Sequence, residues 1–111
     1  MKIISREELM KLPAGTLFSY YEPIVFTDLC IKESDLDYGS PDFVISSIIG
    51  EIECNSSDEF QANCEKMELG ESVPTDFGQT MREGLFDDKQ LFAIYEKEDV
   101  RKLIEKLQST L

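Results

Sequence analysis

The amino-acid sequence predicts a small α+β domain, with a largely antiparallel sheet of about four or five strands and helices mainly on one face. Short runs rich in aromatic and β-branched residues alternate with segments that begin like helices, and apolar residues near the end of the chain recur at helical spacing. The chain has 111 residues, of which 41% are hydrophobic, so it can bury one core but not two independent ones. We therefore expect a single acidic domain over residues 1–111.

The first predicted element is a short helix that begins after Ser5. Ser5 and Glu8 have the spacing of a capping box, and Ile4 and Leu9 occupy the two positions of a hydrophobic staple. The Leu-Pro-Ala-Gly sequence that follows disfavours a helix, so we expect this one to end near residues 11–12.

Runs with strand composition follow. The first two are separated only by Glu22-Pro23, which indicates an antiparallel pair, and the second is apolar on both faces at its beginning, as in a central strand. In the third run Gly50 interrupts the pattern and indicates a bulge. The predicted strands span residues 16–21, 24–32, 43–53 and 90–95, and residues 33–41 are expected to form a solvated loop.

A second helix is predicted between the third and fourth strands. Ser56 and Glu59 again have capping-box spacing, Phe60 and Met67 belong to one apolar face, and Gly70 can close the helix in a left-handed conformation. The opposite side of this helix is acidic, so we expect it to be exposed to solvent.

The last helix is predicted to open at Glu98-Asp99. It follows residues 71–89, which have no regular period and are expected to pair in part as a short strand or to pack as an irregular arm. Its apolar face is formed by positions with spacing 0, 3, 4 and 7, namely Val100, Leu103, Ile104 and Leu107.

Negative charge is concentrated in the middle of the chain. The sequence has 23 acidic and 11 basic residues, a net charge of −12, and no histidine. Residues 22–88 contain 17 acidic and 3 basic residues, a net charge of −14, whereas residues 1–21 and 89–111 each carry a net charge of +1. Such a field repels nucleic acid and anionic lipid and attracts a cationic surface, although acidity can also serve solubility alone.

Common catalytic and metal-binding patterns are missing. Without histidine the chain cannot form a Ser-His-Asp or Cys-His arrangement, and Cys30, Cys54 and Cys64 form no Cys-x-x-Cys motif, so we interpret them as buried thiols of a reducing compartment. The segment Asp35–Gly39 resembles a calcium loop but has its glycine one position early, which leaves at most a weak divalent site. We expect no catalytic residue, no metal ligand and no cofactor.

The candidate functional residues are carboxylates that could form one surface. If they converge in space, their charge spacing would resemble that of a nucleic-acid backbone and would fit a basic groove of another protein. The alternative is that each belongs to an ordinary solvated turn. The predicted partner-binding residues are Glu33, Asp35, Asp37, Asp42, Glu51, Glu53, Asp58, Glu59, Asp87 and Asp88.

Three segments of the sequence resemble segments of a known group of proteins. REELMKLPAGTLFSYYEP (residues 6–23), MELGESVPTDFG (67–78) and LFDDKQLFAIYEKEDVRKLIEKL (85–107) are together similar to a group of small acidic bacteriophage and prophage accessory proteins. The resemblance implies a bacterial cytoplasmic setting and an anti-defence role, such as that of anti-CRISPR proteins and DNA mimics. It assigns a role to no individual residue.

These observations predict a non-enzymatic acidic protein that acts as an inhibitor by binding a basic surface of a host protein or nucleoprotein complex, without contacting nucleic acid itself. One alternative is a small enzyme or ligand-binding protein with a pocket between the sheet and residues 71–89. Another is a homo-oligomeric accessory protein, such as a homodimer. We expect no membrane association and a cytoplasmic location, because the sequence has neither a long apolar run nor a secretory signal.

Overall fold

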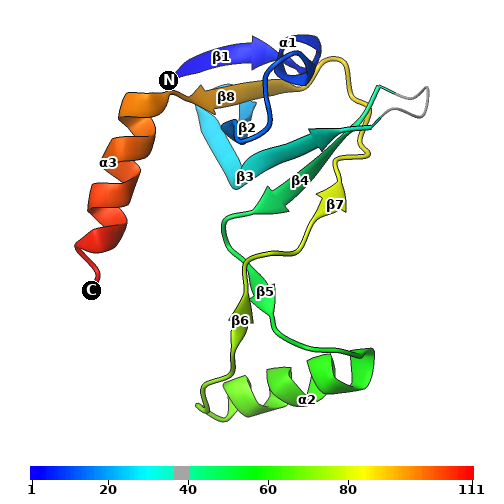
Figure 1. Ribbon diagram of the computed structural model, residues 1–111, viewed down its shortest axis with the longest axis vertical. Coiled ribbons are helices and arrows are strands. Elements are labelled where there is room, and N and C mark those ends of the chain that lie inside the picture. Colours follow the sequence, from blue (N-terminus) through cyan, green and yellow to red (C-terminus); the bar gives the residue numbers. More distant parts are fainter. Residues whose placement is uncertain (37–40) are drawn as a thin grey trace.

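The computed structural model describes residues 1–36 and 41–111 and shows an α+β fold (Figure 1). The helices are α1 (Arg6–Met10), α2 (Ser57–Glu68) and α3 (Lys97–Gln108). The strands are β1 (Lys2–Ser5), β2 (Leu17–Glu22), β3 (Val25–Asp35), β4 (Phe43–Ser47), β5 (Glu51–Ile52), β6 (Thr75–Asp76), β7 (Met81–Arg82) and β8 (Leu91–Tyr95).

Six strands form one sheet in the order β1-β8-β2-β3-β4-β7, and each neighbouring pair is antiparallel. The predicted α+β class and the antiparallel pairing are therefore confirmed. The sheet is larger than the four or five strands expected because β1 and β7 join its two edges. Both are too short to show a strand pattern in the sequence, and it is their pairing with β8 and β4 that makes them strands.

The third predicted strand is divided between two sheets. β4 ends at Ser47, and β5 begins at Glu51 and pairs with β6 in a separate two-stranded sheet. Gly50, expected at a bulge, instead has a left-handed φ of +78° at the change of direction. A Cβ atom at this position would lie 2.7 Å from two ring atoms of Phe77, so glycine is required both for the turn and for the close approach.

The core lies on one face of the six-stranded sheet, where α1 covers it. Leu9, Phe18, Phe43 and Phe92 have no exposed surface, and Cys30 is 4% exposed, which confirms that this thiol is buried. The Phe18 ring makes edge contacts with those of Phe43 and Phe92, at centroid distances of 6.2 and 5.6 Å.

Helix α1 begins and ends with specific contacts. The predicted capping box is present: Ser5 Oγ accepts a hydrogen bond from the Glu8 N–H, and Glu8 Oε1 accepts one from the Ser5 N–H. At the other end, the buried Lys32 Nζ donates to three carbonyl oxygens, those of Leu9, Met10 and Leu12, at 3.3, 2.7 and 2.6 Å. A cation at this end of a helix compensates its unpaired carbonyl groups, so Lys32 joins β3 to α1.

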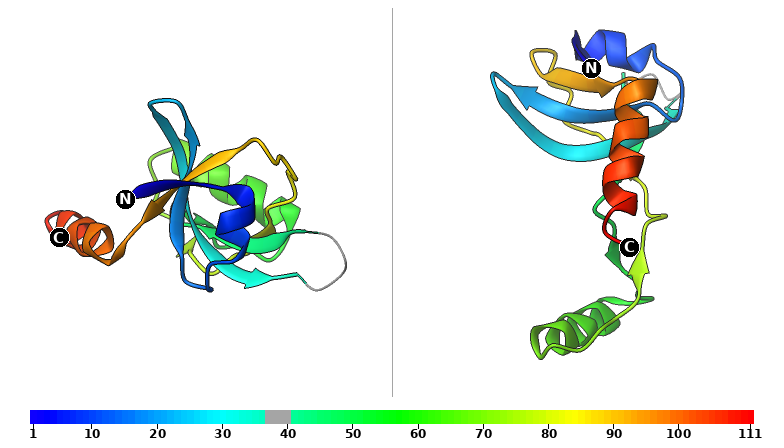
Figure 2. Two further views of the ribbon diagram at one scale, coloured as in Figure 1. Left: turned by 90° about the horizontal axis from the view of Figure 1, so that it is seen from above. Right: turned by 90° about the vertical axis from the view of Figure 1, so that its left-hand side faces the viewer.

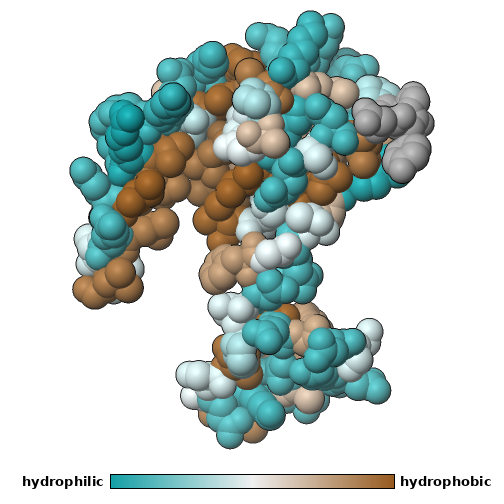
Figure 3. All heavy atoms as spheres, viewed as in Figure 1, coloured by the Kyte–Doolittle hydropathy of each residue, from teal (hydrophilic) through white to brown (hydrophobic). Residues whose placement is uncertain are grey.

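Helices α2 and α3 are present as predicted but lie apart from the core. Ser56 Oγ caps α2 by accepting from the Glu59 N–H, and Gly70 follows it with a φ of +86°. Figures 1 and 2 show α2 at the far end of the β5-β6 pair, while α3 extends away from the end of β8. Figure 3 shows a hollow between α3 and the rest of the molecule. Among the described elements only α1 covers the sheet closely, and most of the surface of α2 and α3 is open.

Candidate functional site

The largest concentration of unpaired negative charge is on a projecting segment, residues 51–76, which we call the arm. It comprises β5, α2 and β6 and extends away from the six-stranded sheet (Figures 1 and 2). It contains eight acidic residues and one basic residue, Lys66, so its net charge is −7. Within the described part of the chain none of these carboxylates takes part in an ion pair. They are Glu51, Glu53, Asp58, Glu59, Glu65, Glu68, Glu71 and Asp76.

The arm also carries an apolar cleft. The cleft has a volume of about 370 Å³. Its lining consists of Ile49, Ile52, Phe60, Met67 and Val73, together with the carboxylates of Glu51 and Glu71. The Phe60 and Met67 side chains are 42% and 46% exposed, although the sequence predicted them on a buried helix face. Apolar groups ringed by charge are the usual composition of a protein-binding surface.

Four of the predicted partner-binding residues lie on the arm, and all four are exposed: Glu51, Glu53, Asp58 and Glu59. The prediction overlooked Glu65, Glu68, Glu71 and Asp76, although the acidic side of the predicted second helix pointed to the first two. Glu59 also has a local role, because its Oε2 accepts a hydrogen bond from the Asn55 N–H at 3.1 Å.

The other predicted acidic residues lie elsewhere. Glu33 accepts a hydrogen bond from Ser46 Oγ, and Asp35 Oδ1 lies 2.8 Å from Lys32 Nζ, both at the β3-β4 pair. Asp87 and Asp88 are exposed in the connection from β7 to β8, at the opposite end of the molecule from α2 (Figure 1). The predicted Asp37 lies outside the described residues. The expected carboxylates therefore occupy separate regions, and the prediction of one common patch is wrong.

Asp42 requires a correction, because it was expected on the surface and is 1% exposed. Its Oδ1 accepts hydrogen bonds from the N–H groups of Phe43 and Gly84, and its Oδ2 lies 2.9 Å from Arg82 Nε. Burial by itself would raise the pKa of this carboxyl, but these donors outweigh it and hold the pKa below its usual value. Asp42 thus connects β4 to the chain around β7 and is not available to a partner.

A buried arginine completes this charge cluster. Arg6 Nη2 lies 2.7 Å from Glu83 Oε2 and 3.4 Å from Asp42 Oδ1. Its guanidinium also lies over the rings of Phe43 and Phe86, 5.4 and 5.5 Å from their centroids. Arg6 is 36 residues from Asp42 and 77 residues from Glu83 in the sequence, so no local sequence pattern could predict these pairs. The cluster is structural, because every charge in it already has a partner within the chain.

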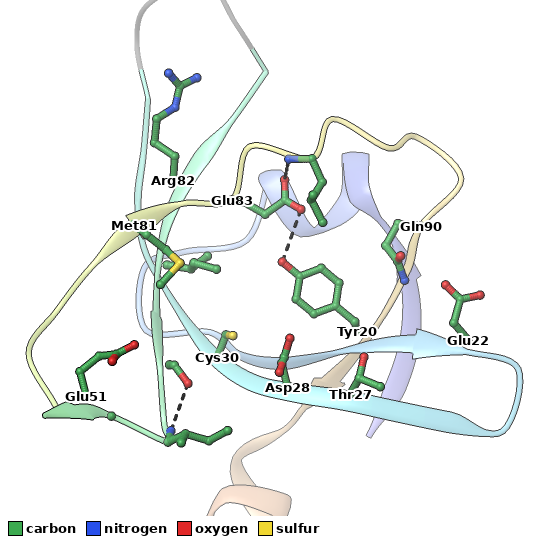
Figure 4. A pocket seen from close by; sticks show the side chains of 15 residues that line it. Tyr20, Glu22, Thr27, Asp28, Cys30, Glu51, Met81, Arg82, Glu83 and Gln90 are labelled. Carbon is green, nitrogen blue, oxygen red and sulfur yellow. Dashed lines mark hydrogen bonds between the residues drawn. The ribbon is translucent and has the colours of Figure 1, made fainter. Parts of the chain in front are cut away.

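A pocket of about 560 Å³ lies between the sheet and residues 81–90, where the ligand-binding alternative expected one (Figure 4). Tyr20, Asp28, Cys30 and Glu83 are among its lining residues. Burial, and then the negative charge of Glu83, raises the pKa of the Tyr20 hydroxyl, while burial and the charge of Asp28 raise the pKa of Cys30 to about 11. The Cys30 thiol is therefore protonated at neutral pH and is a poor nucleophile.

No metal centre is found among the described residues, where no three acidic or cysteine side chains are grouped to hold an ion. All three cysteines are free, with Cys54 and Cys64 half-buried rather than fully buried as expected. In residues 1–36 and 41–111, no helix has the length and apolar character of a membrane span.

The chain was compared with protein-family models, with curated proteins and with solved structures, and none of the three comparisons found a match.

Proposed function

We propose that this protein is a non-enzymatic binding protein whose acidic arm engages a basic surface of another protein. The observation that carries the proposal is the net charge of −7 on a projecting segment whose carboxylates form no ion pairs within the described chain. A segment that stands away from the body can enter a groove or lie along a face, which a charge spread over a flat surface cannot do.

The two properties of the arm have different physical roles. Unpaired carboxylates attract a basic partner over roughly 8–10 Å at physiological salt and raise the association rate. The apolar cleft around Phe60 and Met67 would hold the complex together, because burial of exposed apolar side chains is what slows dissociation. The charge thus selects the partner, and the cleft supplies much of the affinity.

A narrower form of the proposal is inhibition of a nucleic-acid-binding protein. The surface that such a protein offers to phosphate groups is basic, and a row of carboxylates on a projecting helix would compete for it. The choice of a host defence protein as the target rests only on the resemblance of three sequence segments to phage accessory proteins, and the capture experiment below tests it.

The test compares two charge-matched variants of the full chain. Glu65→Gln with Glu68→Gln removes two exposed charges from α2 of the arm, and Glu7→Gln with Glu98→Gln removes two exposed charges elsewhere. Each protein is immobilised and exposed to bacterial lysate at low and high salt, and captured proteins are identified by mass spectrometry. We expect the wild-type protein to capture one basic protein at low salt. The arm variant should capture roughly three- to tenfold less of it, and the control variant should capture as much as the wild type.

For the narrower form, duplex DNA is added as a competitor and should release the captured protein. Capture that is insensitive to salt, or that is lost equally in the two variants, would contradict binding through the arm. Captured protein that DNA fails to release would restrict the proposal to a basic partner that does not bind nucleic acid.

A second candidate function is the binding of a small cationic ligand in the pocket beside Tyr20. Its lining includes the carboxylates of Glu22, Asp28 and Glu51, which form no ion pair within the described chain, whereas Glu83 and Arg82 are already paired in the buried charge cluster. Native mass spectrometry of the purified protein would show a bound metabolite as added mass. Spermidine serves as a defined probe: tight binding that Asp28→Asn abolishes supports this function, and no binding excludes it for polyamines.

A further inference from the structure

The pocket beside Tyr20 and the apolar cleft of the arm meet at the junction between the sheet and the arm. Ile49, Gly50 and Glu51 line both of them, where the chain passes from β4 to β5. The two hollows therefore form one groove, which runs from the sheet onto the arm, and a single occupant can contact both parts.

Apolar side chains are exposed along this groove. In the pocket, Ile49, Met81 and Leu85 are 75%, 52% and 65% exposed. On the arm, Phe60 and Met67 continue the apolar lining. A hydrophobic surface of this extent that is bordered by charged residues is typical of a binding site for another chain.

Carboxylates border the groove along its length. Glu22 and Asp28 at the pocket, and Glu51 and Glu71 towards the arm, are all exposed, and none forms an ion pair within the described chain. Figure 4 shows Glu51, Asp28 and Glu22 following one another along one side of the pocket. Arg82 is the only base among the described lining residues, and it is already paired with a buried carboxylate. Charge complementarity therefore requires an occupant that is cationic at several positions along its length.

The end of β4 offers backbone groups to an extended occupant. β7 pairs only with Val44 and Ile45, so among the described strands none adjoins Ser47 on that side, and Ser47 lines the pocket. The Phe43 carbonyl accepts the Glu83 N–H on the β7 side, and the backbone groups of alternate residues in a strand face the same way, so those of Ser47 face this side as well. An extended peptide can pair with a free strand edge of this kind.

On the basis of the function proposed above, we propose that the basic partner binds through an extended segment that lies along this groove, with basic residues alternating with apolar ones. Successive side chains of an extended chain point to opposite sides. The apolar side chains enter the groove, and the long basic side chains reach back to the carboxylates at its border. Free backbone groups and a row of carboxylates favour a peptide over a small cation, which would use only one part of the groove.

Defined peptides and the full chain test the proposal. The probe is an octapeptide of alternating lysine and valine with blocked ends, and its control has the same composition with all lysines placed before all valines. Isothermal titration calorimetry at low salt measures the affinity of each. The alternating peptide should bind roughly tenfold more tightly, because both peptides carry the same charge but only the alternating one separates charged and apolar side chains onto opposite sides.

Matched variants locate the bound peptide. Asp28→Asn at the pocket and Glu71→Gln on the arm should each weaken its binding by roughly three- to tenfold. Glu105→Gln removes an exposed carboxylate of α3, outside the groove, and should leave the affinity unchanged. Asparagine suits position 28, where φ is +53°, because it is one of the residues that adopt this conformation most readily.

Equal affinity for the two peptides, or binding of neither, would overturn the proposal. Binding that only Asp28→Asn weakens would also overturn it, because the peptide would then be confined to the pocket. Binding of spermidine without binding of either peptide would assign the pocket to a small cation instead.

Failure of this proposal is distinguishable from failure of the proposed function, because Asp28 is not part of the arm. A basic protein that wild type and Asp28→Asn capture equally, but that Glu65→Gln with Glu68→Gln captures less, would retain binding through the arm and exclude a segment along the groove. Capture of no basic protein by the wild type would contradict the proposed function itself.

Discussion

Arg6 is the residue on which most of the buried charge depends. Its guanidinium contacts Glu83 and Asp42, and the side chains of all three are at most 3% exposed. Arg6→Met would keep much of the side-chain volume but leave both carboxylates with one buried cation fewer. We expect a loss of roughly 3–5 kcal/mol in the free energy of unfolding, measured by urea denaturation.

The control for Arg6 is an arginine in an exposed ion pair. Arg101 lies 3.2 Å from Glu98, with both side chains 68% exposed, so Arg101→Met should cost less than about 1 kcal/mol. Equal losses in the two variants would show that the buried contacts of Arg6 contribute no more than a surface pair.

Ile24 is a strained residue at the turn between β2 and β3. It has a φ of +64°, which a β-branched side chain adopts at a cost of about 1–2 kcal/mol, and it is 89% exposed, so packing does not offset that cost. Ile24→Gly should therefore raise the free energy of unfolding by roughly 0.5–1 kcal/mol. Val25→Gly, one residue further in the strand, should lower it, and a decrease in both variants would contradict the strain at Ile24.

At the scale of elements, Gly50 determines how the arm leaves the sheet. Gly50→Ala would strain a left-handed residue and force the Phe77 ring aside, whereas Gly15→Ala imposes only the left-handed strain, because its Cβ would meet nothing within 4 Å. Hydrogen exchange should show faster opening of the α2 amides, by roughly tenfold, in Gly50→Ala alone. Phe77→Ala in the same chain should restore part of the protection. Unchanged exchange in α2 would mean that the arm does not depend on this contact.

At the scale of the whole molecule, stability should decrease in alkaline solution. The pKa of Cys30 is raised from 9.0 to about 11 in the folded protein, so above pH 9 the unfolded chain loses a proton that the folded chain keeps. The number of bound protons is then lower in the unfolded state, and the free energy of unfolding falls as pH rises, by roughly 2 kcal/mol between these two values. Tyr20, whose pKa is also raised, extends the loss to higher pH.

Urea denaturation at a series of alkaline pH values measures this dependence. The slope of stability against pH should become smaller in Cys30→Ala, even though that variant is less stable at neutral pH because of its lost volume. Tyr20→Phe should reduce the slope at the highest pH values. A slope that neither substitution changes would assign the loss to other groups.

The whole molecule also shows why the candidate surface was only half predictable. Half of the charge excess in the middle of the sequence, −7 of −14, lies on the acidic arm, where residues close in sequence also stay close in space. Asp42 belongs to the same acidic region but is buried, because the closing of the sheet brings Arg6 and Arg82 to it from distant parts of the chain. Whether a carboxylate is exposed to solvent or ion-paired depends on contacts with residues distant in sequence, and a local sequence pattern does not reveal them.

The sequence by itself determined the elements whose signals are local. The capping residues Ser5 and Ser56, the main strands and the apolar side of α3 follow from neighbouring residues, and the structure contains all of them. Only the tertiary structure decided that β1 and β7 complete the sheet, that Gly50 separates two sheets, and that α2 and α3 stand away from the core. The physical reason is that pairing and burial are properties of residues distant in sequence, whereas capping and periodicity are properties of residues a few positions apart.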